Sequence, residues 1–109
     1  MAELSKKSCV PCRTGAPKLK REEIENYLTD LEKDWKVVDN HHLYKKFNFP
    51  DFISTLNFVN KIGEIAEEEG HHPNICFTWG IVEVKIWTHK IDGLHENDFI
   101  LAAKIDKLV

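Results

Sequence analysis

The sequence predicts an α+β fold of two layers, a four-stranded antiparallel sheet with helices on one face. Apolar residues recur at helical spacing in three segments, and four further segments read as strands, the last with Val82, Val84 and Ile86 alternating with more polar positions. These segments follow one another in the order α-β-β-α-β-β-α, and consecutive strands joined by short turns favour antiparallel pairing under a layer of helices. A chain of 109 residues has room for one such domain.

Charge and hydropathy exclude several classes of protein. The 15 Lys and Arg and 18 Asp and Glu residues give a net charge of −3, so there is no basic stripe for nucleic-acid phosphates. No apolar run approaches the ~20 residues of a membrane helix, and the polar residues 1–7 do not resemble a secretory signal. We therefore expect a cytoplasmic protein that binds neither nucleic acid nor membranes.

The first 20 residues predict an arm that precedes the domain formed by residues 21–109. The arm mixes Ser, Lys, Pro and Gly without a hydrophobic period. Cys9 and Cys12 form a Cys-x-x-Cys pair, but a structural zinc site needs four ligands and the sequence has no second such pair. We favour a solvated or redox-labile tail over a metal or thiol function, and we assign the pair no role.

The first helix and the first pair of strands lie before residue 50. Apolar residues at helical spacing predict a helix over 21–31. Strands are expected at 35–38 and 43–49, and Asp39-Asn40 between them suits a hairpin turn.

The longest periodic segment begins at Pro50 and Asp51 and ends at Gly70. Proline suits the first turn of a helix and glycine commonly follows the last one. The expected buried face consists of Phe52, Leu56, Val59, Gly63 and Ala66, widened by Phe58, Ile62 and Ile65. We expect this helix to pack against the sheet or a partner.

Two more strands and a helix complete the chain. Residues 75–79 and 81–88 read as strands joined by a tight turn at Gly80, and a last helix is expected over 95–107. Its inner stripe consists of Leu94, Leu101, Ala102, Ile105 and Leu108.

Three of the six histidines occupy positions where binding groups collect. His71 and His72 follow the helix-ending glycine, and because Pro73 favours extended geometry before it, we expect their rings to diverge. His89 ends the last strand. Such imidazoles support a three-histidine metal site with an open position or metal-free proton transfer near neutral pH. Adjacent histidines are unusual for chelation, and loop histidines without a catalytic role are a third interpretation.

A set of residues at ordered intervals carries a family resemblance. The set is the run Glu67-Glu68-Glu69-Gly70-His71-His72-Pro73, then Trp79, Thr88-His89, Gly93-Leu94 and Asp98. It resembles the signature of the pterin-4a-carbinolamine dehydratases and covers most of the chain after the arm. The Cys-x-x-Cys arm is similar to the bacterial branch of that family.

The resemblance implies the same α+β fold, assembled into homodimers or homotetramers. It implies a lyase that dehydrates 4a-hydroxytetrahydropterin to quinonoid dihydropterin, in tetrahydrobiopterin recycling after aromatic amino-acid hydroxylation. No metal and no cofactor are implied, because the pterin is the substrate. Some relatives serve instead as dimerisation or assembly partners, so a non-enzymatic oligomeric partner or coactivator is the alternative function.

The resemblance also assigns roles to residues. His71 and His89 would be the acid/base pair, and His72 would orient the substrate with a secondary proton role. The expected substrate-binding residues are Glu67, Pro73, Thr88 and Asp98.

Several of these assignments have a plainer interpretation beside them. Glu67 would orient an imidazole or be a solvated acid, and Asp98 would be a contact at the pocket rim or a charge that complements the helix dipole. Trp79 and Trp87 read as packing groups rather than as a stacking surface for the pterin. His95 replaces the Thr or Ser with which the family caps its last helix, so we expect that helix start to be less secure.

Overall fold

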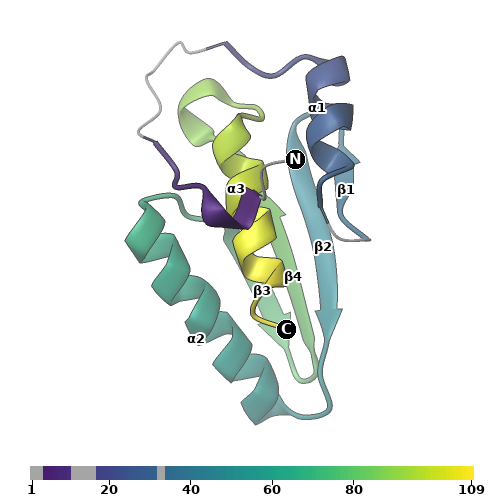
Figure 1. Ribbon diagram of the computed structural model, residues 1–109. Coiled ribbons are helices and arrows are strands. Elements are labelled where there is room, and N and C mark those ends of the chain that lie inside the picture. The colour runs from purple at the N-terminus through teal and green to yellow at the C-terminus, as the bar shows by residue number, and fades with distance from the viewer. Residues whose placement is uncertain (1–3, 11–16, 32–33) are drawn as a thin grey trace.

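The structure, a computed structural model (Figure 1), describes residues 4–10, 17–31 and 34–109, so Cys12 lies outside the described residues. Its elements in chain order are the 3₁₀ helix η1 (Leu4–Lys6), α1 (Arg21–Leu28), β1 (Lys36–Val38), β2 (His42–Asn48), α2 (Phe52–Glu69), β3 (Asn74–Thr78), β4 (Ile81–Ile86), the 3₁₀ helix η2 (His89–Ile91) and α3 (Glu96–Asp106).

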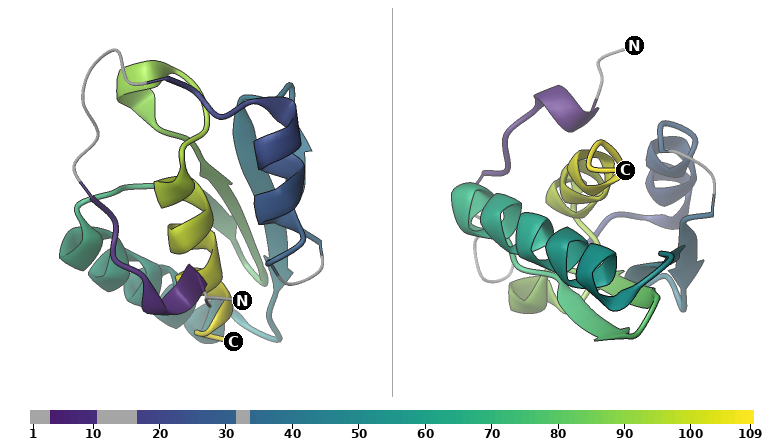
Figure 2. Two further views of the ribbon diagram at one scale, coloured as in Figure 1. Left: turned by 45° about the horizontal axis from the view of Figure 1, so that its top comes forward. Right: turned by 90° about the horizontal axis from the view of Figure 1, so that it is seen from below.

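The four strands form one antiparallel sheet in the order β1-β2-β4-β3. The three α-helices lie on the same face of this sheet, with α3 between α1 and α2 (Figure 2). The predicted α+β architecture and element order are therefore confirmed. In the described part of the chain, no helix is long and apolar enough to cross a membrane.

Both predicted hairpin turns are present. Asp39 and Asn40 have positive φ values of 54° and 52° and are the central residues of the turn in which the His41 N–H donates to the Val38 carbonyl oxygen (2.9 Å), as in the primed turns that match the twist of hairpin strands. Gly80 joins β3 to β4 with a φ of 78°, and a Cβ there would lie 3.0 Å from the carbonyl oxygen of Phe49. Glycine is needed at this turn for both reasons.

Helix α2 begins at Phe52, two residues later than the predicted start at Pro50. The Asp51 side chain accepts a hydrogen bond from the backbone N–H of Ser54 (2.8 Å) and so caps the helix. Pro50 lies outside it, and the expectation of a proline in the first turn is wrong. Gly70 ends the helix in the left-handed conformation, as predicted.

The buried face of α2 is partly the predicted one. Phe58, Ile62 and Ala66 are buried as expected, whereas Phe52 is exposed and the other expected residues are half-buried. The buried residues are Thr55, Phe58, Ile62 and Ala66. Phe58 packs against two aromatic rings of the sheet side, at 4.7 and 4.9 Å between centroids, which sets the rotation. Thr55 replaces an apolar residue in the core because its hydroxyl donates to the Asp51 carbonyl and accepts from the Gly80 N–H.

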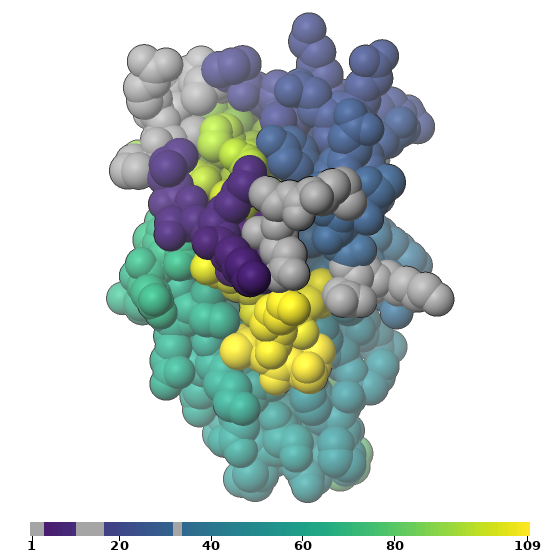
Figure 3. Space-filling view, in the orientation of Figure 1, coloured from purple at the N-terminus to yellow at the C-terminus, as the bar shows by residue number. Residues whose placement is uncertain are grey.

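Helix α3 is buried on nearly all sides. Most of the predicted stripe is in the core, together with Phe99 and Ile100, which were not predicted. The reason is visible in Figures 2 and 3: the sheet lies on one side of α3, and residues 4–10 of the arm lie across the other. Leu4 is buried there, so this part of the arm is packed rather than solvated.

Candidate active site

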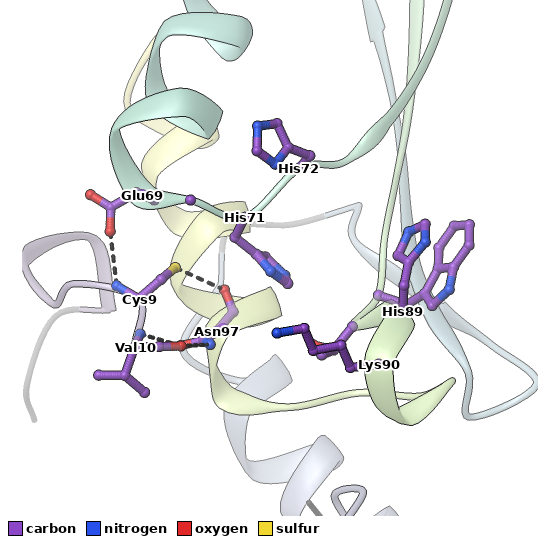
Figure 4. A pocket seen from close by; sticks show the side chains of 11 residues that line it. Cys9, Val10, Glu69, His71, His72, His89, Lys90 and Asn97 are labelled. Atoms are coloured by element: carbon purple, nitrogen blue, oxygen red, sulfur yellow. Dashed lines mark hydrogen bonds between the residues drawn. The ribbon is translucent and has the colours of Figure 1, made fainter. Parts of the chain in front are cut away.

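A cavity of about 570 Å³ lies where the loop after α2, the end of β4 and the start of α3 meet. Pockets for small molecules commonly have volumes of ~300–1,000 Å³. The lining residues are Cys9, Val10, Glu69, Gly70, His71, His72, Trp87, Thr88, His89, Lys90 and Asn97. The structure thus brings all three predicted histidines to one cavity (Figure 4).

His71 is held by both its backbone and its ring. Its backbone N–H donates to the carbonyl oxygen of Ala66 and closes the end of α2. Its Nε2–H donates to Oδ1 of Asp98 over 2.6 Å. This bond leaves Nδ1 as the ring nitrogen with a free lone pair. Figure 4 shows His71 and Lys90 extending toward one another across the cavity.

Asp98 is fully buried behind this imidazole. Its Oδ2 accepts from the Thr88 hydroxyl (2.9 Å) and from the backbone N–H of His95 (2.8 Å). It therefore complements the N-terminus of α3, as one interpretation predicted, and also fixes the ring of His71. It does not lie at the rim. The expectation about His95 is wrong, because its Nδ1 accepts from the N–H of Asn97 and caps the helix.

The ring of His72 turns away from that of His71, as the Pro73 argument predicts. Its Nε2 pairs with Oε2 of Glu67 at 2.5 Å, and both side chains are largely exposed. Glu67 thus orients an imidazole, but it is His72 and not the neighbouring His71.

His89 stands against an aromatic surface. Its ring lies parallel to the indole of Trp87, with centroids 4.4 Å apart and planes at 4°. Within the described residues, we find no hydrogen bond to the His89 ring. The indole also contacts the rings of His41 and His42. Burial lowers the pKa of His42, and the nearby His41 lowers it further.

Only some of the other predicted site residues line the cavity. Thr88 lines the cavity, whereas Glu67, Pro73 and Asp98 are not among the described residues that line it. Trp87 lines the cavity as well, although the sequence favoured a packing role for it. Trp79 is exposed at the hairpin turn, at the other end of β4 (Figure 1). Among the described residues, no group of three His, Cys, Asp or Glu side chains is arranged to hold a metal ion.

Besides Trp87, six lining residues were not predicted as site residues: Cys9, Val10, Glu69, Gly70, Lys90 and Asn97. Lys90 follows the Thr88-His89 pair directly, so its position was a usable signal. The arm residues carried none, because their contacts join positions 60 to 88 residues apart. Burial raises the pKa of the Cys9 thiol to about 12, with Glu69 adding to the effect, so this side chain is a neutral part of the wall at physiological pH.

The fold and the cavity together define a class of protein. It is a small two-layer α+β protein with a ligand-sized cavity at which imidazoles pair with carboxylates. Residues 17–108 match the family described as pterin 4 alpha carbinolamine dehydratase. The chain belongs to this family.

Two relatives match all or nearly all of the chain and are named, provisionally, as pterin-4-alpha-carbinolamine dehydratases. One from Rickettsia canadensis (strain McKiel) is 53% identical over 109 residues, 100% of both chains. One from Rubrobacter xylanophilus is 55% identical over 108 residues, 99% of this chain and 100% of the relative.

Two solved structures share the fold at 28% identity. A transcriptional coactivator/pterin dehydratase from Brucella melitensis has a TM-score of 0.79 and covers 84% of this chain and 98% of its own. A pterin dehydratase-like protein described as a RuBisCO assembly factor in the alpha-carboxysome has a TM-score of 0.62 and covers 71% and 90%.

Proposed function

We propose that this protein is a hydro-lyase that dehydrates 4a-hydroxytetrahydropterin to quinonoid dihydropterin by histidine acid/base catalysis. The observation that supports this most is the convergence of His71, His72 and His89 on one cavity of ligand size. Family membership supports the same substrate class.

The reaction removes water, so one proton must reach the leaving 4a-hydroxyl and another must leave N5 of the pterin. His71 is suited to accept the N5 proton at Nδ1, because Asp98 behind its other nitrogen stabilises the imidazolium that forms. His89 in its protonated form gives a proton to the hydroxyl, which departs as water. Proton exchange with solvent then returns both rings to their starting states.

The remaining residues bind and orient the substrate. His72, held by Glu67, stands at the exposed side of the cavity and orients the pterin, with a secondary proton role. Thr88 and Trp87 form the wall beside His89, and Pro73 fixes the extended loop that carries the two adjacent histidines. General acid/base assistance of this kind contributes typically 10²–10⁴-fold, or roughly 3–5 kcal/mol.

The same proposal includes the setting of the reaction. It takes place in tetrahydrobiopterin recycling in the cytoplasm, beside an aromatic amino-acid hydroxylase, with no metal or added cofactor. The protein works as a homodimer or homotetramer. Phe77 on the edge strand β3 is 42% exposed beside Phe52, which supports self-association of this surface.

The direct experiment measures dehydration of freshly generated 4a-carbinolamine with and without the protein, before and after exhaustive chelation. We expect acceleration over the spontaneous rate of about 10²-fold or more, unchanged by chelation. No acceleration contradicts the proposal. Activity that is lost on chelation and restored by zinc favours the metal-dependent alternative.

The alternative is a non-enzymatic partner protein on the same fold. One observation favours it, the likeness to a protein described as a RuBisCO assembly factor. Absence of acceleration in the same assay, together with stable binding of another protein, would support this reading.

A further inference from the structure

The ring of His89 is oriented differently from those of the other two cavity histidines, which pair with carboxylates. Its imidazole lies parallel to the indole of Trp87, with centroids 4.4 Å apart and planes at 4°. The His89 side chain is exposed, and among the described residues no hydrogen bond to its ring is found. The aromatic stack is therefore the contact that orients this imidazole.

The stack follows from the position of both residues at the end of β4. Ile86 and Thr88 are buried, so the alternation of an extended chain puts Trp87 and His89 together on the opposite side. Thr88 between them is extended, with φ −93° and ψ 107°, and its backbone bridges to Gly93. The backbone thus brings the two rings to the same side, two residues apart.

The indole is itself held by its neighbours. β2 begins beside the end of β4, so His42 lies next to Trp87 on the neighbouring strand. The rings of His41 and His42 contact the indole at 5.3 and 5.8 Å between centroids. Trp87 is also half-buried and packs against the edge of the core. A packed side chain keeps one rotamer, so the indole offers the His89 ring a fixed surface.

We propose that Trp87 is a positioning residue that acts through His89, rather than a surface on which the pterin stacks. The inference rests on the proposed function and deepens it, because it concerns the group that protonates the leaving hydroxyl. The imidazole covers one face of the indole, so that face is closed to a second flat ring.

An indole suits the proposed acid for two reasons. Its face engages neither nitrogen of the His89 ring, so both remain available to the substrate. Aromatic faces also attract cations, so the contact is kept while His89 carries the proton that it gives to the hydroxyl.

The test compares Trp87→Leu, Trp87→Phe and Trp79→Leu with the parent in the full chain. Leucine keeps an apolar wall but removes the flat face, and phenylalanine restores a flat ring. Trp79→Leu is the matched control, because it makes the same change at an exposed tryptophan at the other end of β4. The measurements are kcat and KM for carbinolamine dehydration, the Kd of 7,8-dihydrobiopterin, and the NMR shifts of the His89 ring protons, assigned with His89→Ala.

We expect kcat to fall about tenfold in Trp87→Leu, with KM and Kd within about twofold of the parent, because the imidazole is present but no longer aimed. Trp87→Phe is expected to keep most of the parent kcat, and Trp79→Leu to match the parent in every quantity. The indole ring current shifts the His89 ring protons upfield in the parent, and this shift disappears in Trp87→Leu. A purely structural role would lower the fraction of folded protein and leave kcat per folded molecule unchanged.

The outcomes separate the inference from the proposed function. If the parent dehydrates carbinolamine and Trp87→Leu keeps its kcat, the inference is overturned and the proposed function stands. A rise in KM and Kd with unchanged kcat overturns it as well, in favour of a surface on which the pterin stacks. Should Trp87→Leu fail to fold, the parent spectrum decides, because an upfield shift supports the stack and ordinary shifts overturn it. If the parent accelerates nothing, the proposed function fails and the role of Trp87 falls with it.

Discussion

At the scale of single residues, Asp98 connects more of the site than any lining residue. Its two oxygens accept from the His71 ring, the Thr88 hydroxyl and the His95 backbone, so one buried carboxylate joins three chain segments. Buried carboxylates require this degree of hydrogen bonding, because an unpaired one is costly. The same group therefore contributes to stability and to the orientation of the proposed base.

Asp98→Asn tests this double role. The amide keeps the shape of the carboxylate but places a donor where three donors converge. We expect kcat to fall about 10- to 100-fold and the free energy of unfolding to fall by about 1–3 kcal/mol. Steady-state kinetics and urea unfolding provide the two measurements.

Asp92→Asn is the control for that variant. Asp92 pairs with His41 from an 80% exposed position, and asparagine also tolerates its left-handed backbone. We expect kcat within about twofold of the parent. Equal losses in the two variants would contradict the role assigned to Asp98.

At the scale of elements, the C-terminal end of α2 aims the first histidine. Gly70 has a φ of 66°, and the turn it makes directs the chain from the helix into β3 so that His71 meets Asp98. The sequence predicted this helix end correctly, because glycine commonly follows the last turn of a helix and the proline after the two histidines favours an extended chain. It predicted Phe58, Ile62 and Ala66 on the buried face of the helix but missed Thr55, because hydrophobic spacing does not predict a buried threonine.

The glycine within α2, Gly63, and the glycine that ends it, Gly70, allow a matched comparison. Gly70→Ala puts a Cβ on a left-handed residue, so we expect a loss of about 1–2 kcal/mol of unfolding free energy and a lower kcat, since His71 is displaced. Gly63→Ala lies in the helix, where a Cβ meets nothing within 4 Å. There we expect a gain of about 0.5–1 kcal/mol and unchanged kcat. Chemical unfolding with the dehydration assay checks both, and a loss of stability at Gly63 would contradict the assigned helix face.

At the scale of the whole molecule, the cavity forms where segments distant in sequence meet. The element pattern was predictable because each helix and strand carries its own periodicity, and the histidines were predictable because they flank element ends. The arm was not, since Cys9 and Val10 reach Glu69 and Asn97 by polar contacts that leave no periodic trace. Nor was the partner of Glu67, because only the loop geometry selects His72 over His71.

The most direct measurement of the central claim is the dehydration rate of His71→Ala and His89→Ala beside Trp79→Ala, whose side chain is exposed at the far end of β4. The account predicts that each histidine variant folds like the parent and loses about 10²-fold or more of the acceleration, while the tryptophan variant keeps it. Parent-like turnover by both histidine variants would contradict the claim that these two imidazoles move the protons.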